Sequence, residues 1–247
     1  MSLALPPAPW IVGHRGVRAE ITENTLAGLR AAVAQGADIV EMDVQLAADG
    51  VLVVFHDWDL QRLAGRSEVV ESLNSGELDA VRVRDPQAVE DGARHPVPRL
   101  AEALDALPPE LPLNLELKRR RAETGTFLDA LERHLDRHHN LLISSFDWEL
   151  LGALRARRPA LALAPVARRD ARALLVAGER LGAFSLHCRE TLAGRRLAGA
   201  AAAAGRPLLA YTVNDAARAR ELLDLGLSGV FTDRPGRLRA ELEEGTG

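Results

Sequence analysis

The chain has 247 residues, 47% of them hydrophobic, a length that allows one large core. Its net charge of −4 gives no reason to expect a nucleic-acid partner or an anionic membrane surface. A single cysteine, Cys188, excludes an internal disulfide, and no apolar run is long enough to cross a bilayer. The first ten residues lack a basic segment followed by a long apolar one, so no signal peptide is expected. We therefore expect a soluble cytoplasmic protein without stable membrane insertion.

Short apolar runs alternate along the chain with stretches of helical periodicity. The predicted strands are Trp10 to Gly13, Ile39 to Leu46, Val51 to Phe55, Leu113 to Leu117, Leu141 to Ser145, Leu161 to Val166, Phe184 to His187, Leu208 to Val213 and Gly229 to Thr232. The predicted helices are Thr25 to Gln35, Leu100 to Leu107, Thr126 to Arg137, Glu149 to Arg157, Arg169 to Leu181, Leu192 to Ala204 and Ala216 to Leu225. Strands that alternate with helices predict a parallel sheet covered by helices.

This order of elements predicts an α/β fold, a TIM (β/α)8 barrel formed by residues 1–247 as a single domain. Eight barrel strands remain if the run Val51 to Phe55 folds back as a hairpin on the strand before it. The stretch from about residue 58 to residue 98 is polar, contains several Gly and Pro and is weakly periodic. We expect it to be a small irregular insertion after the second barrel strand and its hairpin. An open, doubly wound sheet is the alternative fold.

The segment Ile39 to Asp57 joins two alternating apolar runs at Asp49-Gly50, the strongest short signal for a β-hairpin. A turn centred on these two residues places Asp43 opposite His56. A four-residue loop instead places Glu41 opposite His56. In either register the carboxylates and His56 share one face, because side chains alternate along a strand.

Polar side chains gather at the carboxyl ends of the predicted strands, where TIM-barrel active sites lie. Glu41, Asp43 and Glu116 offer carboxylate oxygens, which suit Mg²⁺ or Ca²⁺ better than Zn²⁺. Arg15 and Lys118 add positive charge nearby, the usual setting for a phosphate group.

Two histidines lie at the same strand ends, His14 after the first strand and His56 after the hairpin. Imidazole exchanges protons near neutral pH, so these are the candidate general acid and base.

Glu116 and Lys118 are two residues apart on one strand and could simply pair with each other rather than bind a metal and a phosphate. Asn24 precedes the first predicted helix. It either caps that helix or supports the residues of the site.

Several short segments occur in a fixed order along the chain. They are His14-Arg15-Gly16, Glu23-Asn24-Thr25, Glu41-Met42-Asp43-Val44, Asp49-Gly50, His56-Asp57, Glu116-Leu117-Lys118, Tyr211-Thr212-Val213-Asn214 and Gly229 to Pro235. This set resembles the signature of the glycerophosphodiester phosphodiesterase family, and it covers nearly the whole chain.

The sequence departs from the family pattern at two positions. Thr22 stands where the family usually has proline, which should affect only the loop that contains it. Tyr211 stands where tryptophan is frequent, at a position expected to line the alcohol or glycerol pocket.

The resemblance implies a TIM barrel with an inserted segment after His56. It also implies metal-dependent hydrolysis of a small-molecule glycerophosphodiester to glycerol 3-phosphate and an alcohol, with the glycerol hydroxyl next to the phosphate as the first nucleophile. By position, the acid/base pair is His14 and His56, the ligands of one divalent cation (Mg²⁺ or Ca²⁺) are Glu41, Asp43 and Glu116, and the phosphate binders are Arg15 and Lys118. Tyr211 and His187 are expected to contact substrate, although His187 could equally be a plain strand-end polar group.

Two other functions are compatible with the sequence. One is a lysophospholipase-D-like phosphodiesterase for longer-chain lipids. It would need an exposed apolar rim around the insertion, for which Trp58, Leu60 and Leu63 are the only hints. The other is a non-catalytic barrel that binds phosphodiesters. Neither the headgroup nor the oligomeric state follows from the sequence.

Overall fold

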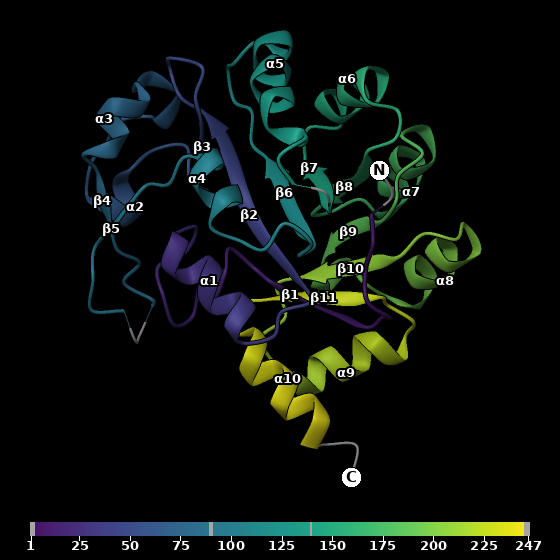
Figure 1. Ribbon diagram of the computed structural model, residues 1–247. Coiled ribbons are helices and arrows are strands. Elements are labelled where there is room, and N and C mark those ends of the chain that lie inside the picture. The colour runs from purple at the N-terminus through teal and green to yellow at the C-terminus, as the bar shows by residue number, and fades with distance from the viewer. Residues whose placement is uncertain (1–2, 89–90, 139, 245–247) are drawn as a thin grey trace.

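The computed structural model describes residues 3–88, 91–138 and 140–244, and within them eight parallel strands form a closed barrel (Figure 1). The strands are β1 (Trp10–Gly13), β2 (Ile39–Leu46), β6 (Leu113–Leu117), β7 (Leu141–Ser145), β8 (Ala162–Ala167), β9 (Leu186–Arg189), β10 (Leu208–Tyr211) and β11 (Gly229–Thr232). The barrel closes because β1 pairs with β11 on one side and β2 on the other. The TIM-barrel prediction is confirmed, and the open-sheet alternative is wrong.

Helices surround the barrel, mostly where the periodicity predicts them (Figure 1). They are α1 (Leu26–Ala34), α4 (Leu100–Asp105), α5 (Thr124–Leu135), α6 (Trp148–Arg157), α7 (Ala171–Arg180), α8 (Arg195–Ala203), α9 (Ala216–Asp224) and α10 (Pro235–Glu244), of which α10 was not predicted. Asp147, Asp170 and Asp215 begin three of them as side-chain caps, each accepting from a backbone N–H of the first turn. The apolar faces of these helices pack against the outward-facing strand residues in one continuous cluster.

The lower half of the barrel interior is closed by an apolar plug. It consists of Trp10, Val12, Ile39, Leu209 and Phe231, all buried. Phe231 of this plug also lines a cavity toward the carboxyl ends of the strands, the end at which TIM-barrel active sites lie.

The hairpin adopts neither predicted register. Its outer strand, β3 (Leu52–Val54), pairs antiparallel with β2 and places Val44 opposite Val54. The loop spans three residues, 48–50, and Gly50 takes the left-handed conformation at φ 77° that such a loop requires. Both predictions assumed an even number of loop residues, and the odd number shifts every opposed pair by one position.

The insertion after the hairpin is more regular than predicted. It contains α2 (Gln61–Ala64), a 3-10 turn at Val70–Ser72, α3 (Ser75–Asp79) and a two-stranded sheet of β4 (Arg82–Val83) and β5 (His95–Pro96). Its buried apolar cluster includes Leu60, Leu63 and Leu78, together with Val53 and Phe55 from the hairpin. Elements of two to five residues are too short to give a visible period, which is why the sequence appeared irregular.

Thr22 ties this insertion to the barrel. Its backbone N–H donates to Asp91 Oδ2 at 2.8 Å, its hydroxyl also donates to Asp91, and it accepts from Asp85 N at 3.0 Å. Proline has no N–H and no hydroxyl and could make none of these bonds. The effect of Thr22 therefore extends beyond its own loop.

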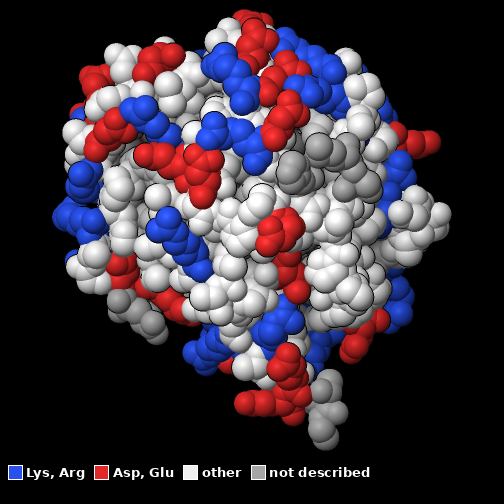
Figure 2. All heavy atoms as spheres, viewed as in Figure 1, with Lys and Arg blue, Asp and Glu red and all other residues white. Residues whose placement is uncertain are grey.

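Acidic and basic side chains are intermingled over the face in Figure 2, so neither sign of charge forms a continuous field there. Among the described residues, no helix combines the length and the apolar character needed to cross a bilayer.

Candidate active site

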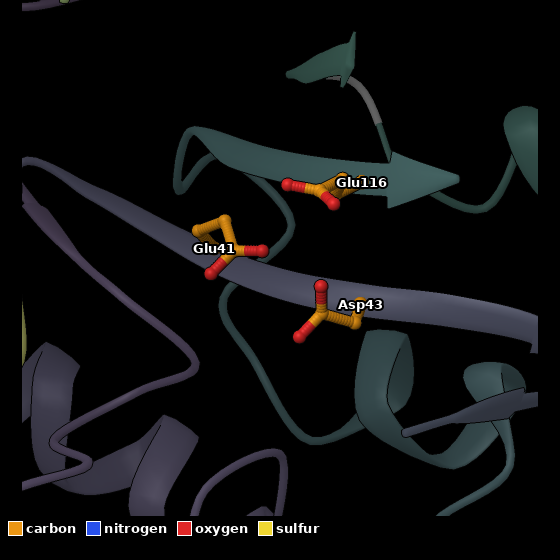
Figure 3. Close-up of side chains that lie close together, drawn as sticks. All are labelled: Glu41, Asp43 and Glu116. Carbon is orange, nitrogen blue, oxygen red and sulfur yellow. The ribbon is translucent and has the colours of Figure 1, made fainter. Parts of the chain in front are cut away.

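Three carboxylates converge between β2 and β6 at the carboxyl end of the barrel (Figure 3). Glu41 and Asp43 are successive inward-facing residues of β2, and Glu116 lies opposite Asp43 on β6. One oxygen from each lies within 4.8 Å of the others. Glu41 and Asp43 are each 1% exposed, so two of these acids are almost entirely withdrawn from solvent.

The surroundings shift the pKa values of Glu41 and Asp43 in opposite directions. Burial raises the pKa of Glu41 well above its ordinary value, and the neighbouring charges of Asp43 and Glu116 raise it further. Burial also acts to raise the pKa of Asp43, but Lys118 and Arg15 more than offset this, so it lies well below its usual range. Lys118 Nζ lies 2.7 Å from Glu116 Oε1 and 3.2 Å from Asp43 Oδ1.

This donor set fits a divalent cation. Glu41 Oε1 is buried and has no hydrogen-bond partner among the described residues, although an unpaired buried carboxylate oxygen is costly. Three hard oxygen donors with one unused oxygen are what Mg²⁺ or Ca²⁺ prefers. The expected Glu116–Lys118 pair is also present, and it does not remove Glu116 from the carboxylate group.

Arg15 is held in place by its backbone as well as by its side chain. It lies in the left-handed region at φ 55°, which directs its N–H to Glu41 Oε2 at 2.8 Å. Its guanidinium donates to Glu23 at 2.9 Å, and Nε lies 3.2 Å from Asp43. The next residue, Gly16, has φ 92°, and a Cβ there would lie 2.6 Å from the backbone of Gly28. Glycine at this position lets the loop pack against α1.

Asn24 supports Asp43 rather than capping α1. Its amide donates to Asp43 Oδ2 at 2.8 Å and accepts from Asp43 N at 3.1 Å. Thr25 is the residue that caps the helix. Of the two alternatives for Asn24, the structure therefore selects the supporting role.

Each candidate acid/base histidine is paired with a carboxylate through Nδ1. His14 Nδ1 lies 2.8 Å from Asp233 Oδ1, and His56 Nδ1 lies 2.6 Å from Asp57 Oδ1. Hydrogen bonds from His56 and Arg62 outweigh the effect of burial and lower the pKa of Asp57 to about 2. The pKa of Asp233 is also lowered, chiefly by its bond to His14 against the effect of burial.

His14 is itself buried, and burial lowers its pKa, with Arg15 adding to the effect and Asp233 opposing it. His56 reaches the site through a turn, because β3 ends at Val54 before His56. Gln45 Nε2 holds this turn by donating to Phe55 O at 2.8 Å and Asp57 O at 2.7 Å.

A small cavity of about 50 Å³, which we call the inner pocket, brings most of the predicted site residues together. Those that line it are His14, Arg15, Glu41, His56, Glu116, Lys118, His187 and Tyr211. Phe146, Val166, Arg168 and Phe231 complete its wall. Asp43 lies beside the pocket, beneath the cations that bind it.

The two predicted substrate contacts differ in surroundings. His187 is 1% exposed, with its ring 4.9 Å from that of Phe231 and Nε2 3.1 Å from Ser185 Oγ. Burial lowers the pKa of His187 to about 3, so it is neutral. The Tyr211 hydroxyl donates to Ala167 O at 3.0 Å, which fixes the ring in the wall.

A larger cavity of about 680 Å³, which we call the outer groove, lies next to the inner pocket. It is lined by Trp58 and by the segments 116–119, 145–148 and 166–170, which follow β6, β7 and β8. Glu116, Lys118, Phe146, Val166 and Arg168 line both cavities, so the two are contiguous.

Several residues of the site were not assigned a role from the sequence. Asp57 and Asp233 appear there only as members of the motif segments, and that membership was the available signal. No local sequence pattern indicates a role for Arg62 or Arg168, because each reaches the site through tertiary contacts. Arg62, in the insertion, binds both Asp57 and Glu23.

The barrel divides into two arcs of adjacent strands. The consecutive strands β11, β1, β2 and β6 supply the carboxylates, both cations and the His14–Asp233 pair, and the hairpin on β2 supplies His56. The consecutive strands β7, β8, β9 and β10 supply wall residues: Phe146, Val166, Arg168, His187 and Tyr211.

The sequence profile of the glycerophosphoryl diester phosphodiesterase family matches residues 14–237. The chain belongs to this family. It is accordingly a phosphoric diester hydrolase of the glycerophosphodiester class, and the resemblance inferred from the motifs is confirmed.

Relatives and solved structures agree with this placement. A glycerophosphodiester phosphodiesterase of Bacillus altitudinis is 28% identical over 92% of this chain and 95% of its own length. A solved phosphodiesterase of Oleispira antarctica, in complex with the product sn-glycerol-3-phosphate, is 30% identical with a TM-score of 0.88, covering 96% of this chain and 97% of that one. Mouse lysophospholipase D GDPD3 is 30% identical over 62% of this chain and 48% of its own length.

Proposed function

We propose that the protein hydrolyses glycerophosphodiesters to glycerol 3-phosphate and an alcohol, with one divalent cation, Mg²⁺ or Ca²⁺, held by Glu41, Asp43 and Glu116. The observation that carries this proposal is the buried carboxylate group beside two histidines that are each paired with a carboxylate. The product bound in the Oleispira antarctica structure supports the same product here.

When bound, the cation would supply positive charge to a phosphate oxygen and lower the pKa of a coordinated hydroxyl. Arg15 and Lys118 place two further positive charges beside the carboxylates, where they stabilise the charge that develops on phosphorus-bound oxygens. Lys118 keeps this charge at neutral pH, because Asp43 and Glu116 raise its pKa against the effect of burial.

The paired histidines transfer the protons. Both carboxylate partners have lowered pKa values and are ionised at neutral pH, so each Nδ1 donates its proton and each Nε2 remains available for transfer. The lowered pKa of His14 keeps it neutral and suits it to take the proton from the attacking hydroxyl. His56 then donates a proton to the departing alcohol.

The nucleophile comes from the substrate. None of the described residues that line the inner pocket is Ser, Thr or Cys, the usual protein nucleophiles. We propose that the glycerol hydroxyl next to the phosphate attacks phosphorus to give a cyclic phosphate, which water then opens. An analogue without this hydroxyl should release no alcohol under conditions that hydrolyse the parent compound. Equal turnover of the analogue would exclude the internal nucleophile.

A coupled assay for glycerol 3-phosphate, with metal-free protein and with added Mg²⁺ or Ca²⁺, tests the proposed activity. His14→Ala and His56→Ala should each lower kcat by about 10² to 10⁴ while leaving the melting temperature unchanged. Unaltered activity in metal-free protein would contradict the metal requirement and favour a non-catalytic role for the carboxylates.

Substrates with different leaving groups distinguish the proposed roles of His14 and His56. A p-nitrophenyl ester needs no protonation of its leaving group, whereas a choline ester does. His56→Ala should therefore lose far less activity on the p-nitrophenyl ester than on the choline ester, and His14→Ala should lose activity on both. The opposite pattern would reverse the acid and base roles.

Among the described residues, the three apolar side chains expected to form a rim for a long-chain lipid do not form one. Leu60 and Leu63 are buried inside the insertion, and of the three hints only Trp58, 39% exposed, faces solvent. The comparison with lysophospholipase D covers less than half of that protein.

A further inference from the structure

The outer groove has aromatic walls and an excess of positive charge. Aromatic surface comes from Trp58 of the insertion, Phe146 of the loop after β7 and Trp148 at the start of α6. Four basic residues, Lys118, Arg119, Arg168 and Arg169, and three acidic residues, Glu116, Asp147 and Asp170, line it. Its volume of about 680 Å³ lies within the range that holds a small organic ligand.

The acidic residues of the groove are already engaged. Glu116 accepts from Lys118 at 2.7 Å, and Asp147 accepts from Arg119 Nε at 2.9 Å and caps α6. Asp170 caps α7 through Ala173 N at 2.8 Å. These bonds leave little of the negative charge available to a ligand.

Arg168 and Arg169 are exposed, and neither has a carboxylate within ion-pair distance among the described residues. The Arg168 guanidinium carbon lies 4.5 Å from the centre of the Phe146 ring. Its positive charge also opposes the rise that burial causes in the pKa of Tyr211. The contact with Phe146 places a charged guanidinium, without a carboxylate partner in the described part of the chain, at the junction of the inner pocket and the outer groove.

We infer that the outer groove is the subsite for the leaving alcohol, and that Arg168, assisted by Arg169, favours alcohols that carry an anionic group, a carboxylate or a phosphate. The inference rests on the proposed function, because the inner pocket must hold the glycerol phosphate for the alcohol to lie in the groove. A guanidinium fork matches either anion, so the shared chemistry is an oxyanion at the far end of the leaving group.

The placement also explains why Arg168 need not act on the reacting phosphate. Arg15 and Lys118 already approach the carboxylate group from β1 and β6. Arg168 follows β8, on the opposite arc of the barrel, and is turned toward Phe146 and the groove. Its charge therefore acts on the part of the substrate that differs from one glycerophosphodiester to another.

The test uses three glycerol phosphodiesters that share a benzyl leaving group and differ in the charge of its para substituent, with the leaving groups 4-carboxybenzyl alcohol, benzyl alcohol and 4-(trimethylammonio)benzyl alcohol. The kcat/KM of each is measured for the wild-type protein, Arg168→Gln and Arg169→Gln in the presence of the activating cation. The intrinsic reactivity of each leaving group cancels when the same ratio is compared between proteins. Arg180→Gln, an exposed arginine at the far end of α7, is the matched control.

We expect wild-type protein to prefer the anionic over the cationic ester, and Arg168→Gln to lower this ratio about tenfold, because the lost charge attracts one ester and repels the other, each by the few-fold effect of an exposed charge contact. Arg169→Gln should lower it less, and Arg180→Gln should leave it unchanged. The wild-type preference should shrink as ionic strength rises. Melting temperatures show whether each variant is folded.

Two results would overturn the inference while leaving the proposed function intact. One is a wild-type protein that hydrolyses all three esters without charge preference. The other is an Arg168→Gln variant that slows all three equally, which would place Arg168 on the reacting phosphate or in a structural role. Failure of wild-type protein to release glycerol 3-phosphate from any of them would overturn the proposed function, and the inference with it.

Discussion

Glu41 is buried beside two like charges, and one of its oxygens has no hydrogen-bond partner among the described residues. Its folded-state pKa lies above the unfolded one, so the folded protein holds the additional proton. That contribution to stability is complete below the unfolded pKa and is lost as pH rises through the folded pKa. In metal-free protein, Glu41 should therefore make the free energy of unfolding lower at neutral pH than at a pH below the unfolded pKa, because the unfolded chain releases the proton first.

Glu41→Gln should raise the melting temperature of metal-free protein at pH 7, by about 2–4 °C for each kcal/mol recovered. The difference in melting temperature between the variant and wild type should vanish near pH 4. Saturating Mg²⁺ or Ca²⁺ should reverse the order, since a ligand at 100 times its Kd adds about 2.7 kcal/mol to wild type. Thermal melts with chelator and with cation measure both effects. A Gln variant that gains as much from the cation as wild type would remove Glu41 from the ligand set.

Asp233 orients His14 and raises its pKa. Asp233→Asn should lower kcat by about 10² to 10⁴, because an amide can donate to Nδ1 and leave Nε2 protonated. The acid limb of the pH–rate profile should also move to lower pH, since loss of the carboxylate removes the influence that raises the His14 pKa.

The matched control is Asp215→Asn, an exposed cap on α9 whose amide can still accept from Arg218 N. It should leave the pH–rate profile unchanged. An acid limb that moves to higher pH in Asp233→Asn would contradict the assigned pairing.

At the scale of elements, the insertion connects to the catalytic machinery through Arg62. Its Nε donates to Asp57 Oδ2 at 2.7 Å, and Nη2 donates to Glu23 Oε1 at 2.7 Å. Asp57 holds His56, and Glu23 holds Arg15. One side chain of α2 therefore binds the carboxylate partners of both His56, the proposed proton-transfer residue, and Arg15, the proposed phosphate binder.

Arg62→Ala should lower kcat about tenfold, and millimolar guanidinium ion should restore part of it, because the missing group is a charge-assisted donor at a defined place. Arg66→Ala is the control, since Arg66 lies in the same insertion and its one ion pair among the described residues is with the partly exposed Glu68. Activity loss in Arg62→Ala without rescue, and with an equal fall in melting temperature, would point to a purely structural role.

At the scale of the whole molecule, we propose that barrel and insertion form one domain. The insertion's apolar cluster includes hairpin residues Val53 and Phe55, and Thr22 of the barrel binds Asp91. Leu60→Ala in the insertion and Leu115→Ala in the barrel should each lower the free energy of unfolding by about 2–5 kcal/mol. In both variants the barrel and the insertion should still unfold in one shared transition. Calorimetry provides the measurement. A separate low-temperature transition in Leu60→Ala would make the insertion an independent unit.

The sequence predicts the barrel well because its strands are buried apolar runs and its helices are amphipathic, and both patterns are local. It points to eight of the nine proposed site residues because they lie in contiguous motifs at strand ends, whereas His187 was noted only as the end of a strand. The hairpin register was missed because it depends on one loop residue. The Asp233 partner of His14 is 219 positions away and Arg62 lies on a four-residue helix, so no local pattern could indicate either contact.

The division of the barrel into two arcs has a consequence for how such enzymes can diversify. The arc from β11 to β6 holds nearly every group that we propose to perform the reaction, so a substitution there should endanger turnover itself. The loops after β7 and β8 contain no cation ligand and no proton carrier, so they can vary while the chemistry continues. New substrate ranges can therefore arise, in nature or by directed evolution, through changes confined to segments 145–148 and 166–170.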